Sequence, residues 1–284
     1  MFSTFSIVAY DQDSGEVGVA VQSKFLSVGA VVPFARASAG ALATQAFANT
    51  SYGPKALDLL AQGVEPAAVA RELTAGDEGR EDRQFGLVDT HGRAASFTGS
   101  NCIPWAGGIA GDGFAAQGNC LAGAAVVDAL SGAFASSTGH LADRLVAALR
   151  AAQAAGGDKR GQQSAALIIE KPGGGYAGFN DRYVDLRVDD HAQPIEELAR
   201  LLELHKLYFF PAAPQDVVAI DAQLGGEIAR ELVRVGAIDS AAGYDDRTRE
   251  ALVRFMHVEN LENRVRTDDT IDRQTLAYLR AHKR

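Results

Sequence analysis

The sequence predicts an α+β fold followed by a small all-α domain. Segments with strand patterns and segments with helix patterns come in clusters along the first two thirds of the chain. Strict alternation would favour a doubly wound parallel sheet, so the clusters favour separate layers of sheet and helix. After a stretch with two prolines at residues 209–216, the pattern changes to short helical units. We therefore expect one domain over residues 1–210 and a second, helical domain over residues 211–284.

Two strands at the start of the chain predict a β-hairpin. Thr4–Asp11 (TFSIVAYD) and residues 16–25 (EVGVAVQSKF) flank a turn rich in Asp, Ser and Gly. From Val17 onward neither face of the second strand is polar until its end, which predicts burial on both sides. The apolar residues 30–47 are expected to continue this sheet, with breaks at Pro33 and Gly40.

Periodicity and turn residues predict the other elements of the first domain. Pro54 suits the first position of a helix, and Gly63 suits the position after its end. The predicted helices are residues 51–63, 66–76, 124–135, 140–157 and 194–209. The predicted strands are residues 83–89 and 93–99, paired as a hairpin, and residues 164–171 and 182–189. A glycine-rich stretch, residues 105–123, separates the hairpin from the helices that follow.

Three helical units are expected in the second domain, at residues 228–239, 243–260 and 270–284. Asp246 and Asp272 each stand just ahead of an amphipathic run. An aspartate in that place accepts hydrogen bonds from the first free N–H groups of a helix, so both are predicted N-caps.

Charge and composition exclude several classes of function. The formal net charge is −9, which argues against nonspecific binding to nucleic acid or to an anionic membrane surface. No apolar run approaches the length of a spanning helix, and no secretory signal is visible. The 2 cysteines and 6 histidines show no metal spacing, and the glycine-rich stretch lacks the GK[ST] of a nucleotide-binding loop. We expect a cytoplasmic protein without metal or cofactor.

Seven short motifs, taken in order, resemble the DUF1028 family. They are TFSIVAYD, VGVAVQSKF, ATQAFANTSYGPKAL, GDEGREDRQFGLVD, NCIPWAG, AAQGNCLAG and GDKRGQQSAAL, and the resemblance covers roughly Thr4 to Leu207. It implies the fold of the N-terminal nucleophile (Ntn) hydrolases, a four-layer αββα sandwich of two antiparallel sheets between helix layers.

Further along the chain, GYDDRTREALVRF and TIDRQTLAYL resemble peptidoglycan-binding modules. The segment that carries them would bind glycan or peptide, or would serve a structural role; a cytoplasmic location favours the structural role.

The Ntn resemblance implies a nucleophile at the first residue of the mature chain, and Thr4 matches that position. Its hydroxyl would attack a carbonyl, and its own α-amine would accept the proton. An α-amine titrates at about 7.7–8.0, which suits this task at neutral pH. Phe2 and Ser3 precede Thr4, so a cut before Thr4 is required. The alternative is that Thr4 is an ordinary β-branched residue at the start of a strand.

Other polar residues, near predicted strand ends or in the glycine-rich stretch, are candidates for the same site. Ser23 and Lys24 end the second strand, where the resemblance implies a serine and a basic residue near the nucleophile; Lys24 would tune the amine, or would simply extend into solvent. Asn119 is the candidate oxyanion donor, and Gln45 and Asn49 are candidates for binding a polar substrate. These amides also suit plain loop-shaping hydrogen bonds.

A mixed-charge segment supplies the last candidate. Arg160 follows Asp158 and Lys159 and would hold a substrate carboxylate in a bidentate pair, although most such clusters are surface ion pairs.

The sequence therefore predicts a hydrolase of a linear amide bond in a small metabolite, with catalytic Thr4, Lys24 and Asn119. Ser23, Gln45, Asn49 and Arg160 would bind the substrate. The alternative is a noncatalytic scaffold that binds a small molecule or assembles with copies of itself. A homodimer is expected from the size and the fold.

Overall fold

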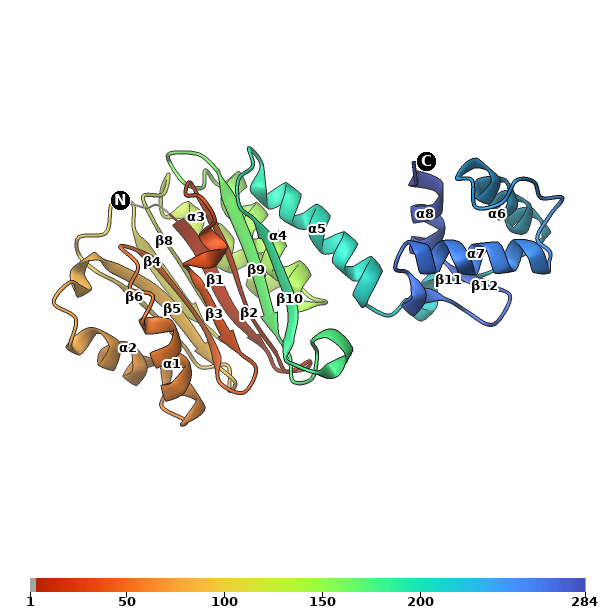
Figure 1. Ribbon diagram of the computed structural model, residues 1–284. Helices are drawn as coiled ribbons and strands as arrows, with labels where there is room; N and C mark the ends of the chain where they lie inside the picture. Colours follow the sequence, from red (N-terminus) through yellow and green to blue (C-terminus); the bar gives the residue numbers. More distant parts are fainter. Residues whose placement is uncertain (1–3, 284) are drawn as a thin grey trace. The chain divides into compact units, whose positions relative to one another are not determined.

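Two antiparallel β-sheets face each other in the first of two units of the chain, which ends at Leu202 (Figure 1). The structure is a computed structural model, and it describes residues 4–283. The larger sheet has the strand order β10-β9-β2-β1-β8-β7. Its strands are β1 Thr4–Asp11, β2 Glu16–Ser23, β7 Gly107–Gly111, β8 Phe114–Asn119, β9 Ser164–Glu170 and β10 Arg182–Val188. The smaller sheet has the order β3-β4-β5-β6. Its strands are β3 Pro33–Arg36, β4 Gly40–Ala46, β5 Arg83–Asp89 and β6 Ala94–Thr98.

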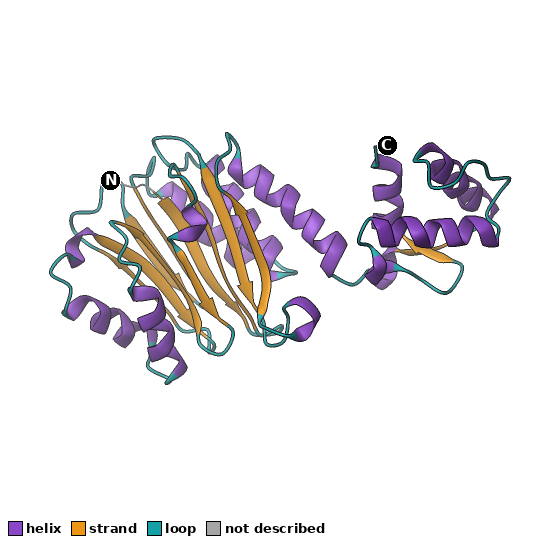
Figure 2. Ribbon diagram, viewed as in Figure 1, coloured by secondary structure: helices purple, strands orange, loops and turns teal. Residues whose placement is uncertain are grey.

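Helices cover the outer face of each sheet (Figure 2). Helices α1, Tyr52–Ala61, and α2, Pro66–Ala75, pack on the smaller sheet, where Leu57 and Leu73 meet Phe85 and Leu87. Helices α3, Ala125–Ser136, and α4, Leu141–Ala154, pack on the larger sheet. Helix α5 spans Pro194–Phe209, and the 3-10 turns are Val28–Ala30, Arg80–Asp82, Tyr176–Gly178, Pro214–Asp216 and Glu262–Arg264. No helix among the described residues is long and apolar enough to cross a membrane.

The layer between the two sheets is apolar at one end and polar at the other. Alternate residues of each strand point into it, because side chains of a strand alternate between its faces. Valines and alanines of both sheets fill the apolar end, among them Val8, Val19, Val21, Ala41, Ala43, Val88 and Ala115. The polar end, at the start of β1, holds the candidate site.

The structure confirms the first hairpin and corrects the segment that follows it. β1 and β2 pair from Thr4 opposite Ser23 to Asp11 opposite Glu16, and every residue of β2 is buried. Residues 30–47 do not continue this sheet: β3 and β4 belong to the smaller sheet. The prediction was wrong because an apolar pattern identifies a strand without identifying its partner.

The glycine-rich residues 105–123 form a further hairpin that the sequence does not predict. β7 and β8 pair with each other there, and β8 also pairs with β1. Glycine has no side chain, so it cannot show an alternation of polar and apolar residues, and its strand propensity is low. The sequence of this segment therefore does not indicate strands.

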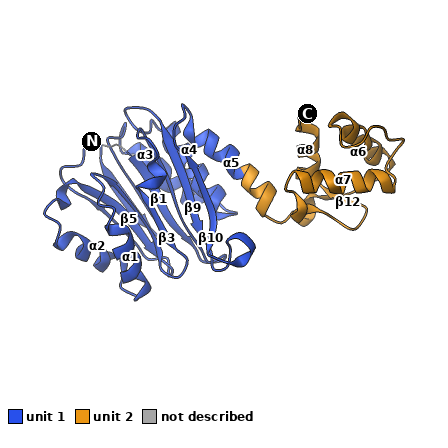
Figure 3. Cartoon of the chain, viewed as in Figure 1, with its two compact units in different colours: residues 1–202 blue, residues 203–284 orange. Residues whose placement is uncertain are grey.

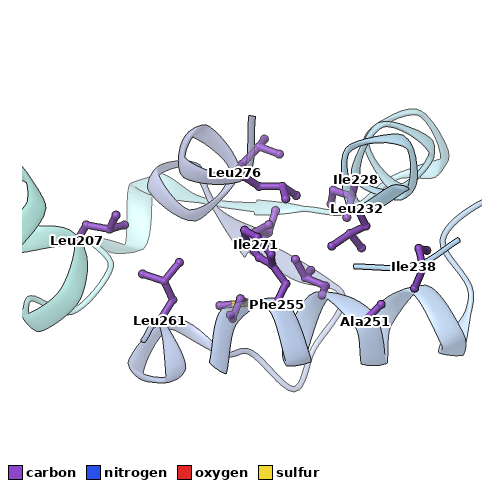
Figure 4. Close-up of a cluster of buried hydrophobic side chains, with 12 residues drawn as sticks. Leu207, Ile228, Leu232, Ile238, Ala251, Phe255, Leu261, Ile271 and Leu276 are labelled. Atoms are coloured by element: carbon purple, nitrogen blue, oxygen red, sulfur yellow. The ribbon is translucent and has the colours of Figure 1, made fainter. Parts of the chain in front are cut away.

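The second unit, from Glu203, is helical with a small β-ribbon, shown in a separate colour in Figure 3. Its helices are α6 Ala222–Arg234, α7 Asp246–Val258 and α8 Arg273–Ala281. Ile228, Leu232, Phe255 and Leu276 contribute to its core (Figure 4). The prediction of an all-α domain was wrong in one respect, since β11, Val217–Ala219, pairs with β12, Thr270–Asp272. Three-residue strands are too short to show a period.

One of the two predicted N-caps is confirmed. The Asp272 carboxylate accepts hydrogen bonds from the backbone N–H groups of Gln274 and Thr275 at the start of α8. Asp246 is the first residue of α7 instead of its cap; Asp245 caps that helix by accepting from the N–H of Thr248. Adjacent aspartates offer the same chemistry, so the pattern places the cap only to within one residue.

Helix α5 runs from the first unit into the second. The division falls between Leu202 and Glu203, inside this helix, whereas the sequence places the boundary at residues 210 and 211. Leu207 is buried in the core of the second unit, and Tyr208 packs against that core. The last turns of α5 therefore belong to the packing of the second unit.

A buried arginine holds the end of α5 within the second unit. The Arg264 guanidinium donates hydrogen bonds to the backbone carbonyls of Lys206, Leu207 and Phe210. It also pairs with the Asp272 carboxylate at 2.8 Å, and the two side chains are 2% and 1% exposed. The Lys206 carbonyl also accepts from the Phe210 N–H at 3.0 Å. The last carbonyls of a helix lack partners within it, so Arg264 supplies additional donors to the carbonyls at the end of α5.

Replacing Arg264 with methionine should destabilise the second unit by about 3–5 kcal/mol, because it leaves Asp272 buried without its cation. Hydrogen exchange over residues 203–283 of the full chain measures the loss. Arg266→Met is the matched control: Arg266 pairs with Asp268 at 3.0 Å, but the two side chains are 35% and 54% exposed. An exposed pair contributes less than about 1 kcal/mol. Equal effects of the two substitutions would contradict the role given to Arg264.

Candidate functional site

The candidate site begins at the first residue of β1. Thr4 lies opposite Ser23 of β2 on one side and opposite Asn119 of β8 on the other. Its hydroxyl donates a hydrogen bond to Ser23 Oγ at 3.0 Å, and the residue is 2% exposed. Three predicted site residues from distant parts of the sequence are thus adjacent in one sheet, because β1 lies between β2 and β8.

Gln45 of the smaller sheet reaches across to this row. Its Nε2 donates to the Thr4 carbonyl oxygen at 3.3 Å and to Gln84 Oε1 at 2.8 Å. Its Oε1 accepts from the Ser6 hydroxyl at 2.6 Å. One buried amide therefore links the backbone and side chains of β1 to the opposite sheet.

Gln84 and Gln117 complete the buried cluster, and sequence reasoning missed both. Asn119 Nδ2 donates to Gln84 Oε1 at 2.9 Å, and Gln84 Nε2 donates to the Gly118 carbonyl at 2.8 Å. Gln117 Nε2 donates to the Ser6 hydroxyl at 2.7 Å. Gly86 makes room for it, since a Cβ at residue 86 would lie 1.9 Å from Gln117 Oε1. The spacing of Gln117 and Asn119, on one face of a strand, was the available signal.

A pocket of about 220 Å³ opens beside Thr4. Thr4 and Gln45 line it, together with residues between β2 and β3 and residues just after β4. Phe47, which also lines the pocket, is 61% exposed. Thr4 is therefore buried in the sheet, and it also borders a space large enough for a small molecule.

The backbone turns sharply where two strands leave the cluster. Ala46, directly after Gln45, has φ +62°, and Cys120, directly after Asn119, has φ +52°. The left-handed region costs a residue with a side chain about 1–2 kcal/mol, so surrounding contacts must hold these two turns. The Cys120 N–H, for example, donates to the Ile103 carbonyl at 2.7 Å.

Lys24 and Arg160 gather around a buried carboxylate, Asp158. The Lys24 backbone N–H donates to Asp158 Oδ2 at 3.0 Å, and Arg160 Nη2 donates to the same oxygen at 3.0 Å. The Lys24 side chain is exposed, and its ammonium donates to the Gln162 carbonyl at 3.4 Å. These two contacts of Lys24 fix the backbone just after β2 and direct the ammonium to the Gln162 carbonyl.

Asn49 belongs to a different network, centred on Asp77. Asp77 Oδ2 accepts from the Tyr52 hydroxyl at 2.7 Å, from Arg83 Nε at 2.9 Å and from Asn49 Nδ2 at 3.4 Å. Arg83 Nη1 also donates to the Phe47 carbonyl at 2.7 Å. Hydrogen bonds from Arg83 and Tyr52 hold the pKa of the Asp77 carboxyl well below its usual range. Burial and the Asp77 carboxylate raise the pKa of Tyr52.

The described residues contain no group of three or more His, Cys, Asp or Glu side chains placed to hold a metal ion. Cys102 and Cys120 are both buried and form no disulfide. Burial raises the pKa of the Cys102 thiol, which makes it a poorer nucleophile.

Comparison with known proteins identifies the family of this chain. The sequence model described as "Family of unknown function (DUF1028)" matches residues 4–198. The chain belongs to the DUF1028 family. A second model, described as "Putative peptidoglycan binding domain", matches residues 208–279, so both resemblances are confirmed. The crystal structure of the DUF1028 protein SPO2555 from Silicibacter pomeroyi is similar, with 34% identity and a TM-score of 0.67; the match covers 73% of this chain and 88% of that chain. A comparison with curated proteins finds no match.

Four of the seven predicted site residues thus meet in the DUF1028 domain: Thr4, Ser23, Gln45 and Asn119. Lys24, Asn49 and Arg160 hydrogen-bond to other groups, although Lys24 is the next residue after Ser23. The network around Asp77 includes Arg83, which donates to the backbone carbonyl of Phe47, a residue that lines the pocket.

The Asp77 network should stabilise the DUF1028 domain in a pH-dependent way. Asp77 has a lower pKa in the folded protein, so its contribution is complete above its unfolded pKa of about 3.9 and is lost as the pH falls through the folded value. Asp77→Asn should cost about 2 kcal/mol at pH 7, and the difference from the wild type should shrink below about pH 4. Thermal unfolding between pH 3 and 7 measures this difference. The exposed neighbour Glu78 gives a control, Glu78→Gln, expected to match the wild type; a constant Asp77→Asn deficit would contradict the assignment.

Proposed function

We propose that the DUF1028 domain is an Ntn-type hydrolase of linear amide bonds, with Thr4 as the nucleophile. The observation that carries the proposal is the place of Thr4, at the start of β1, bordering a pocket and donating to Ser23 Oγ. Two facing sheets with helices on their outer faces support an Ntn-like αββα sandwich. The mechanism requires a cut before Thr4, which frees its α-amine.

The proposed reaction proceeds through an ester with Thr4. The hydroxyl oxygen attacks the amide carbon of the substrate while the Thr4 α-amine takes the hydroxyl proton. The intermediate collapses, the C–N bond breaks, and the leaving amine receives that proton. Water then attacks the ester, the α-amine again accepts a proton, and a carboxylic acid product leaves with the Thr4 hydroxyl restored.

Neighbours of Thr4 have distinct roles in this proposal. Ser23 orients the nucleophile through the 3.0 Å hydrogen bond between the hydroxyls. Asn119 is the proposed oxyanion donor, because it lies beside Thr4 in the sheet and carries side-chain N–H groups. Gln45 fixes the Thr4 carbonyl. The hydrogen bonds of Asn49 and Arg160 to carboxylates favour a structural role for those two residues.

A second candidate is noncatalytic binding of a small molecule in the same pocket. The contact of Lys24 favours this candidate. The hydrolase would use the Lys24 ammonium to tune the Thr4 amine, whereas the ammonium donates to the Gln162 carbonyl. The two candidates differ in the N-terminus that they require, since only the hydrolase needs a free amine on Thr4.

The first test is the intact mass of the purified protein together with three Thr substitutions. The hydrolase predicts a chain that begins at Thr4. Against a panel of p-nitroanilides, Thr4→Ala should lower the activity roughly a thousandfold or more, while Thr4→Ser retains part of it. Thr44→Ala is the control, because Thr44 is also a buried strand threonine and its hydroxyl has no partner among the described residues. Full activity in Thr4→Ala, or a mass that still includes Phe2, sinks the proposal.

The proposed tuning of the α-amine by Lys24 predicts a pH effect. A nearby cation lowers the pKa of an amine, so Lys24→Met should raise it and move the acidic limb of the pH–rate profile to higher pH. The side chain is exposed, so solvent screening should keep the shift below about one pH unit. Lys171→Met is the control, since Lys171 pairs with Glu16 at the opposite end of β2. Coinciding profiles for Lys24→Met and the wild type would remove Lys24 from the mechanism.

A further inference from the structure

The walls of the Thr4 pocket differ sharply from its polar end. Phe25, Val28, Val31 and Val32, from the segment between β2 and β3, line it. Ala46, the last residue of β4, and Phe47 and Ala48 after it also line the pocket. Val28 and Val32 are buried and therefore form a fixed part of the surface. A ligand in this space meets aliphatic and aromatic side chains over most of its surface.

The side chains that line the pocket offer no partner for a charge. Among the described residues that line it, only Thr4 and Gln45 have polar side chains. The Gln45 amide is committed to the protein, because it bonds to the Thr4 carbonyl, to Gln84 and to Ser6. A carboxylate or ammonium in this space would lose its water without gaining a counterion, which is strongly unfavourable. Among the side chains of the pocket lining, the Thr4 hydroxyl is therefore the polar group that a ligand meets, while Asn119, the proposed oxyanion donor, lies beside Thr4 outside that lining.

The volume of the pocket sets an upper limit on the size of the ligand. An apolar cavity of about 150 Å³ holds one benzene molecule. At about 220 Å³, this pocket has room for a somewhat larger group. That size corresponds to a phenyl ring with a short linker or an aliphatic chain of about six carbons.

We infer that the substrates are amides of uncharged, apolar carboxylic acids, and that the pocket holds the acyl group with its carbonyl carbon at Thr4. The position of the carbonyl rests on the proposed function. The apolar character of the ligand rests on the walls alone, so it also applies to a noncatalytic binding protein. Amides whose acyl group carries a charge, such as glutamine, are excluded from this space.

Binding of simple amides to the full-length Thr4→Ala variant tests the inference without turnover. Ligand-observed NMR gives dissociation constants for acetamide, butyramide, hexanamide, phenylacetamide and L-glutamine. Binding should tighten about fourfold for each added methylene up to hexanamide, because each one buries apolar surface. Phenylacetamide should bind in the range of hexanamide, and glutamine no better than acetamide. A flat series, or a preference for glutamine, would overturn the inference.

A pocket-filling substitution shows whether this pocket is responsible. Val31 is only half-buried, so Val31→Phe should fold and should weaken hexanamide binding at least about tenfold. Val233→Phe is the matched control, since Val233 lies exposed on α6 outside the pocket. Circular dichroism checks that both variants fold. Hexanamide binding that survives Val31→Phe in a folded protein would place the apolar site elsewhere and overturn the inference.

Catalysis and ligand class can fail separately. Chain-length-dependent binding without hydrolysis of hexanoyl p-nitroanilide by the wild type would refute the hydrolase and support the apolar pocket. Thr4-dependent hydrolysis that prefers glutamyl over hexanoyl p-nitroanilide would support the hydrolase and overturn the apolar acyl group.

Discussion

The buried amide of Gln45 joins the two sheets at the end of the sandwich where the chain begins. An unpaired amide in this position would cost about 1–3 kcal/mol, so its partners must stay within hydrogen-bonding distance. Those partners are the Thr4 carbonyl, the Ser6 hydroxyl and Gln84, and they come from strands of both sheets. The offset between the sheets and the place of Thr4 are therefore fixed by the same group.

The amides at the polar end of the sandwich also hold the site in one arrangement. Gln84 bonds to Gln45, Asn119 and the Gly118 carbonyl, so the amides form a connected network and not isolated pairs. Buried networks of this kind specify one arrangement, because each member loses its partner if another moves. The two left-handed residues, Ala46 and Cys120, follow members of this network directly. The left-handed backbone at these two strand ends is thus adjacent to the hydrogen bonds that can offset its conformational cost.

Much of the fold follows from local patterns, and the errors occur where distant parts of the chain meet. The first hairpin and the strand buried on both sides are predicted well, because both depend on neighbouring residues and on alternation. The sheet membership of β3 and β4 depends on how the segment around Val28–Ala30 leaves β2, which no period records. Strands β7 and β8 escape prediction because glycine leaves their faces unmarked.

The same division applies to the candidate site. Thr4 and Ser23 are predictable as neighbours because one short turn sets their register. Asn119 joins them only through the pairing of β1 with β8, a contact between residues far apart in the sequence. Gln84 and Gln117 look like ordinary strand residues until the sheets are stacked. Lys24 was predicted from the resemblance and Arg160 from its charged segment. In the structure Asp158 accepts from the Lys24 backbone N–H and from Arg160, while the Lys24 ammonium donates to the Gln162 carbonyl.

Helix α5 carries a consequence for how the two domains can be exchanged or inherited. Its last turns supply Leu207 to the second core and the Lys206 and Leu207 carbonyls to Arg264, and the next residue, Phe210, supplies a third carbonyl. A recombination event at the proline-containing stretch would separate these groups from their partners. The buried guanidinium of Arg264 would then lack the carbonyls to which it donates. A transplantable version of the C-terminal module therefore has to begin inside the helix, at or before Glu203. The proline-containing stretch at residues 209–216 is therefore not the boundary at which the protein can be divided into two domains.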